Sequence, residues 1–86
     1  MNGYQRERAF HLLHVLERFQ DGVDVSRHAL GVIEGELREL FPDDAACRAE
    51  ADALLAFLRA GGAPPLAPPL AGQLAARLAQ LRTALL

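Results

Sequence analysis

Apolar residues recur along this chain at spacings of three and four, which is the period of an amphipathic α-helix. Stepping 100° per residue from about residue 4 to residue 20 gathers one set of apolar side chains on a single side. These are Ala9, Leu12, Leu13, Leu16 and Phe19. Asp21 and Gly22 predict the end of this first helix, because glycine tolerates the left-handed conformation that closes a helix.

A second helix is predicted to begin at Asp24 or Ser26 and to reach Phe41. Either side chain can accept hydrogen bonds from the free amides of a first helical turn. The predicted apolar face comprises Val25, Ala29, Val32, Ile33, Leu37 and Leu40. Pro42 predicts the end of this helix, because the residue before a proline is pushed out of helical geometry.

Asp43 and Asp44 predict the start of a third helix, as a cap and a first-turn acid that complement its dipole. This helix runs to about residue 60, where Gly61 and Gly62 end it. Its predicted apolar face comprises Cys47, Ala51, Leu54, Leu55 and Leu58, with Phe57 beside them.

Residues 63–70 read Ala-Pro-Pro-Leu twice. Four prolines in six residues predict a stiff, extended connector. A fourth helix follows to residue 86, and its leucines recur at spacings of four, three and four, as in a coiled-coil seam. The seam consists of Leu74, Leu78, Leu81 and Leu85. Since a lone helix of this length is marginal in water, something must cover the seam.

These elements predict an all-α fold, a small helical bundle of three to four helices. Residues 1–62 form a three-helix core, residues 63–69 the proline-rich connector, and residues 70–86 an amphipathic helix that packs on the core or on a second chain. A chain of 86 residues forms one domain that buries only about 60 to 65% of its unfolded surface. Such a thin core gains from burial between chains, which favours a homodimer.

Charge is divided unevenly along the chain. All eleven acidic residues lie between Glu7 and Asp52, and residues 1–52 sum to −5, whereas the rest carries three arginines and no acid. This asymmetry predicts attraction between the two parts, or head-to-tail pairing of two copies. Arg77 and Arg82 lie off the leucine seam, so they can pair with acidic neighbours while the leucines are buried.

The composition also bears on partners and location. No concentrated basic face is present, which argues against a nucleic-acid partner. The apolar stretches are far shorter than the roughly 20 residues of a membrane helix, and the start of the chain is polar, so we expect neither a membrane partner nor a signal peptide. Cys47 is the single cysteine, which favours a reducing, cytoplasmic setting.

One candidate metal site lies on the first helix. Glu7, His11 and His14 fall within about 60° of one another, at a spacing that can gather metal ligands. A zinc site needs three or four ligands, and exposed histidines in a charged stripe are more common than histidine ligands. We therefore predict no metal and no cofactor, and keep metal or small-ligand binding through these residues as an alternative.

Gly31 and Gly35 lie four residues apart on the second helix, where each costs close to 1 kcal/mol relative to alanine. A flat groove that a second helix approaches explains the pair, and a tolerated weakness without a partner explains it equally well. The single serine is a plausible helix cap, and Cys47 shares a face with leucines. No nucleophile, base and acid come together, so the chain is predicted not to be an enzyme.

The predicted function is a non-enzymatic helical protein–protein interaction module, a small adaptor or regulatory protein that forms a homodimer. An antitoxin-like, immunity-like or secretion-chaperone-like binding protein is an alternative. The predicted partner interface combines the glycine pair with the leucine seam: Gly31, Gly35, Leu74, Leu78, Leu81 and Leu85.

Overall fold

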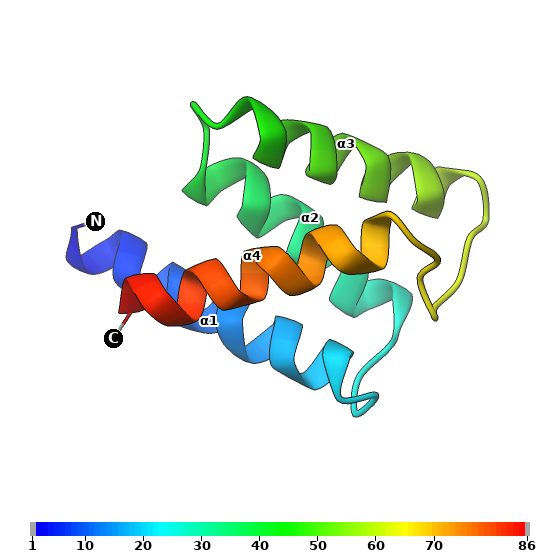
Figure 1. Ribbon diagram of the computed structural model, residues 1–86, viewed down its shortest axis with the longest axis horizontal. Helices are drawn as coiled ribbons and strands as arrows, with labels where there is room; N and C mark the ends of the chain where they lie inside the picture. The colour runs from blue at the N-terminus through cyan, green and yellow to red at the C-terminus, as the bar shows by residue number, and fades with distance from the viewer. Residues whose placement is uncertain (1, 86) are drawn as a thin grey trace.

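The computed structural model describes residues 2–85, which form four α-helices and no strand (Figure 1). The helices are α1 (Gly3–Gln20), α2 (Arg27–Leu40), α3 (Ala45–Arg59) and α4 (Leu70–Leu85). The predicted all-α bundle is confirmed. Leu86, at the end of the predicted fourth helix, lies outside the described residues. Among residues 2–85, no helix combines the length and apolarity that crossing a membrane requires.

Side-chain caps start the helices at or near the predicted positions. The Ser26 hydroxyl accepts a hydrogen bond from the amide of Ala29 at 3.1 Å, and the Asp44 carboxylate accepts one from the amide of Cys47 at 3.0 Å. Asp24 instead accepts from the amide of Ser26 and so shapes the turn before α2. Each cap satisfies an amide that the first helical turn leaves free, which fixes where α2 and α3 begin.

Glycines close α1 and α3 as predicted. Gly22 has φ of 75° and Gly61 has φ of 80°, a left-handed conformation that strains other residues. Gly62 is confined for a different reason, since a Cβ atom there would lie 2.6 Å from the ring of Phe57. The chain can therefore turn tightly at both sites.

Consecutive helices run antiparallel, and α4 closes the bundle on the side away from α2 (Figure 1). The backbone of α2 lies against α1 and α3, and the backbone of α4 lies against the same two helices. The connector between α3 and α4 bends at Pro64–Pro65 and turns at Pro68–Pro69. The prediction of an extended connector is therefore wrong, because the chain must reverse direction to lay α4 on its own body.

The core gathers the apolar faces of all four helices. Its buried members are Ala9, Leu12, Leu16, Leu30, Ile33, Leu37, Leu40, Cys47, Ala51, Leu54, Leu74, Leu78, Leu81 and Leu85. Two predictions for the second helix are wrong. Val25 precedes α2 and is 42% exposed, whereas Leu30, which was not assigned to the apolar face, is fully buried. The late start of α2 after its Ser26 cap explains the displacement of Val25.

Replacing Gly31 or Gly35 by alanine is expected to raise the free energy of unfolding by about 0.5 to 1 kcal/mol each. A Cβ atom at either position would meet nothing within 4 Å, so the change restricts the unfolded chain without a clash. Urea denaturation of the two single variants measures the effect. A lower free energy of unfolding in both variants would contradict this prediction. It would show that a side chain at these positions is unfavourable although nothing lies within 4 Å.

Candidate functional site

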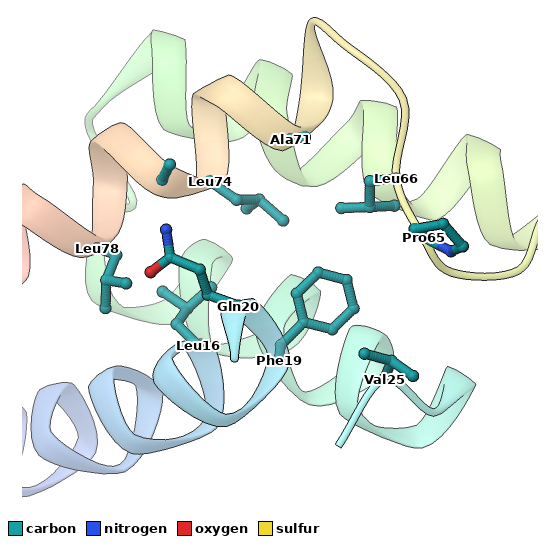
Figure 2. A pocket seen from close by; sticks show the side chains of 10 residues that line it. Leu16, Phe19, Gln20, Val25, Pro65, Leu66, Ala71, Leu74 and Leu78 are labelled. Carbon is teal, nitrogen blue, oxygen red and sulfur yellow. The ribbon is translucent and has the colours of Figure 1, made fainter. Parts of the chain in front are cut away.

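An apolar groove of about 270 Å³ opens between the C-terminal half of α1 and the N-terminal half of α4 (Figure 2). Leu16 and Phe19 face Leu74 and Leu78 across it, and the connector forms one end (Figure 2). The lining residues are Leu16, Phe19, Gln20, Val25, Pro65, Leu66, Ala71, Leu74, Ala75 and Leu78. It is therefore built from four parts of the chain: α1, the turn that precedes α2, the connector and α4.

Small side chains on α4 leave this space open. Ala71 and Ala75 lie one turn apart beside the leucine seam, and both line the groove. Their methyl groups do not fill the gap between α1 and α4, whereas Leu74 and Leu78 beneath them are buried and form a fixed floor. The groove is thus a surface hollow over a packed core, which ties its shape to the core of the bundle.

The groove offers apolar contact with one polar group. Gln20 carries the single polar side chain in the lining, and no lining side chain titrates. Beyond Leu78, the exposed ion pair between Glu17 and Arg82, at 3.6 Å, joins α1 to α4. The chemistry of the groove therefore suits an apolar group with a donor or acceptor at its edge, and it lacks an acid or a base for proton transfer.

A buried arginine fixes the other flank of α4. The Arg77 side chain is 6% exposed, and its Nε and Nη2 atoms donate to the Glu50 carboxylate at 3.2 Å each. Its Nη1 atom donates to Asp44 at 3.3 Å and also to Gln80. The guanidinium lies 5.0 Å from the centre of the Phe41 ring, within cation–π range. This network confirms that Arg77 pairs with acidic neighbours, and it locks α4 to the start of α3.

The same network sets the charge of Asp44. The amide of Cys47 and, after it, the Arg77 guanidinium hold the pKa of the Asp44 carboxyl below its ordinary value. Both groups favour the ionised carboxylate. Asp44 therefore keeps two functions at neutral pH, since it caps α3 and contacts α4.

Cys47 is a packing residue, as predicted. Its thiol is fully buried and donates to the backbone carbonyl of Leu37 at 3.6 Å. Burial raises the pKa of this thiol to about 11. The nucleophilic thiolate is therefore scarce at neutral pH.

Native protein at pH 8 is expected to react with Ellman's reagent at least about tenfold more slowly than the urea-unfolded chain, because Cys47 is both buried and un-ionised. Absorbance at 412 nm follows the reaction. Equal rates in the two states would contradict the burial of the thiol.

The predicted interface residues lie in two places. The four leucines of the seam, Leu74, Leu78, Leu81 and Leu85, are at most 8% exposed and pack inside the core of their own chain. A partner can reach them only if α4 leaves that core, so their role in an interface stays a prediction. Gly31 is exposed and Gly35 half-buried on the outer side of α2, away from the groove.

The candidate metal ligands are exposed on α1. Glu7, His11 and His14 all face solvent. Among residues 2–85, no three His, Cys, Asp or Glu side chains are grouped so that they could hold a metal ion. The metal-binding alternative therefore receives no support from the arrangement.

The groove itself was not predicted from the sequence. Its available signal is the pair Ala71 and Ala75 flanking the leucine seam, which marks a side of α4 too small to fill the space beside α1. Nothing in the spacing of residues indicates that Leu66 and Val25, from two loops, also reach this place. Comparison with protein-family models, with curated proteins and with solved structures found no match.

Proposed function

We propose that this chain is a non-enzymatic protein-interaction module that binds an amphipathic helix of a partner protein in the groove between α1 and α4. The observation that carries the proposal is the groove itself, an open apolar hollow over a fixed core with Gln20 as its single polar side chain. Open apolar hollows of this kind are typical of binding surfaces.

The dimensions favour side chains carried on a helix. A 150 Å³ apolar cavity holds one benzene molecule, so about 270 Å³ has room for nearly two ring-sized groups. The α4 part of the lining runs from Ala71 to Leu78, which is about 10 Å along the helix axis. Two large apolar side chains at positions i and i+4 of a partner helix, about 6 Å apart along its axis, fit within this length and volume.

The lining favours binding over catalysis. It holds no titratable side chain, and Cys47 and the Arg77 network lie outside it. A polar small molecule would leave most of its hydrogen-bonding groups unmatched against leucine, phenylalanine and proline, which is unfavourable. An apolar helix face loses nothing there and can place one polar group against Gln20.

The proposal keeps the predicted class of small adaptor or regulatory protein, with a protein partner and a cytoplasmic setting. The antitoxin-like, immunity-like and secretion-chaperone-like alternatives are compatible with it, since each of these proteins binds a segment of another protein. The groove specifies the chemistry of the segment that binds, an apolar helix face. It does not distinguish among these classes of binding protein.

Ala75→Leu tests the proposal, because a leucine side chain there fills part of the groove. Ala76→Leu is the matched control, since Ala76 is an exposed alanine on the same helix and does not line the groove. The partner is first captured in cells of the source organism through a photo-crosslinking residue at Gln20, and the crosslinked segment is then made as a peptide.

We expect the crosslinked segment to be an amphipathic helix with large apolar residues at i and i+4. Its affinity, measured by calorimetry, should fall at least about tenfold in Ala75→Leu and stay unchanged in Ala76→Leu. A captured segment without such a pattern, equal binding by both variants, or no capture at all would overturn the proposal.

A further inference from the structure

α4 covers a docking face, defined here as the surface of α1 and α3 beneath it together with the carboxylates of Glu17, Asp44 and Glu50. The leucine seam of α4 is buried on this face, and Arg77 enters the site that Asp44 and Glu50 form. All of these contacts are noncovalent. The docking face therefore binds the leucines and arginines of α4 whether this helix belongs to the same chain or to another copy.

Charge defines which helix fits the docking face. Within residues 2–85, every ion pair of α4 runs to the rest of the chain, from Arg77 to Asp44 and Glu50 and from Arg82 to Glu17. α4 has no acid, so two copies of α4 repel each other while each is attracted to a docking face. A second copy of α4 therefore meets both requirements, the leucine seam and the two arginines.

The connector has the reach to deliver α4 to a neighbouring molecule. Ten residues, 60–69, separate α3 from α4. In the extended geometry that proline favours, about 3.1 Å per residue carries them roughly 30 Å. The molecule measures 36 × 27 × 20 Å, so an extended connector spans about its width. In this structure the connector bends at its two proline pairs, and α4 lies on its own body.

We propose that two copies of this chain exchange α4, so that each docking face holds the α4 of the other copy. The exchanged dimer keeps the seam, the Arg77 network and the Glu17–Arg82 pair. Its additional free-energy cost is the translational and rotational entropy that the two chains lose on association. The part of the groove that α1 and α4 form persists in the dimer, whereas Pro65 and Leu66 leave its end when the connector extends. The exchange is tested by the oligomeric state and not by partner binding, so the two proposals can fail separately.

Complementary charge reversals distinguish exchange from folding back. Arg77→Glu places a third acid beside Asp44 and Glu50 within one chain, and Glu50→Arg places two arginines together. In a heterodimer that exchanges α4, each docking face has an opposite-charge pair, one native and one reversed. The two variants are unfolded in urea, mixed and refolded at about 1 mM chain, the order of the effective concentration that a short linker gives.

We expect native mass spectrometry to show at least tenfold more heterodimer than either homodimer, and the mixture to melt at a higher temperature than either variant alone. The variant carrying both reversals in one chain is the control for pairing of the reversed charges. A mixture that stays monomeric and melts as its two components would overturn the proposal where that control folds stably.

A measurement on the unmodified chain decides the matter even if the reversed pair fails to fold. ¹³C-labelled and unlabelled chains are refolded together at the same concentration. Isotope-filtered NOE spectra should then show contacts between chains from Leu81 of α4 to the buried leucines of α1 and α3. Absence of such contacts in the co-refolded sample would overturn the exchange.

Discussion

Leu81→Ala is expected to lower the free energy of unfolding by about 2 to 5 kcal/mol, the range seen when a fully buried leucine is truncated. Leu81 is fully buried in the cluster that joins all four helices, so the cavity it leaves cannot be filled by solvent-facing side chains. Because small domains have only about 5 to 15 kcal/mol of stability, the loss is a large part of the total.

Urea denaturation followed by circular dichroism measures this loss. The Gly31→Ala background adds stability, which keeps the variant folded at low urea. Thr83→Ala is the matched control, an exposed residue two positions along the same helix that should change stability by less than about 0.5 kcal/mol. Equal effects of the two substitutions would show that α4 does not dock through its leucine seam.

The leucine seam shows how far the sequence predicts the fold. Spacings of four, three and four identify the buried side of α4 because helical periodicity is a local property. Whether that side packs on the same chain or on another depends on the path of the connector, which has no period. In this structure the connector bends at Pro64–Pro65 and turns at Pro68–Pro69, and the seam is buried in the core of its own chain. Proline content alone predicts the stiffness of the connector and not its direction.

Val25 and Leu30 show where periodicity gives the wrong assignment. Both fall near the edge of the predicted apolar face, and a shift of the helix start by a few residues decides whether Val25 is in the helix at all. Ser26 caps α2 through the amide of Ala29, so Val25 lies in the preceding turn and lines the groove. A cap is a local signal in the sequence. Which of Asp24 and Ser26 caps α2 depends on the conformation of the turn before the helix, and this conformation is known only from the structure.

The groove could not be predicted because it is a gap between elements. Ala71 and Ala75 are visible in the sequence, but a small side chain makes a hollow only where no neighbour moves in to fill it. Here Phe19 and Leu66 approach from α1 and the connector without closing the space. That outcome depends on how α4 crosses α1, which the residue pattern does not specify.

Arg77→Met is expected to lower the free energy of unfolding by about 2 to 4 kcal/mol, somewhat below the loss of one partner from a fully buried ion pair. The change leaves the Glu50 carboxylate, whose side chain is only 12% exposed, without a cation. Adding Glu50→Leu to Arg77→Met should recover most of the loss, since it replaces the remaining charge with an apolar side chain. Arg82→Met breaks an exposed pair and should change stability by less than about 1 kcal/mol.

The pH dependence separates the ion pairs of Arg77 from its packing on Phe41. The pKa of Asp44 is depressed in the folded chain, so its contribution is present above the ordinary carboxyl value of about 3.9 and is lost as pH falls through the lower, folded value. The stability difference between the native chain and Arg77→Met should therefore shrink as pH falls from 7 to below 4. Asp44 keeps its cap to the Cys47 amide, so part of its own acid sensitivity persists in Arg77→Met. A difference that stays constant over this range would contradict the ion pairs and leave contact with the ring as the reason that Arg77 is buried.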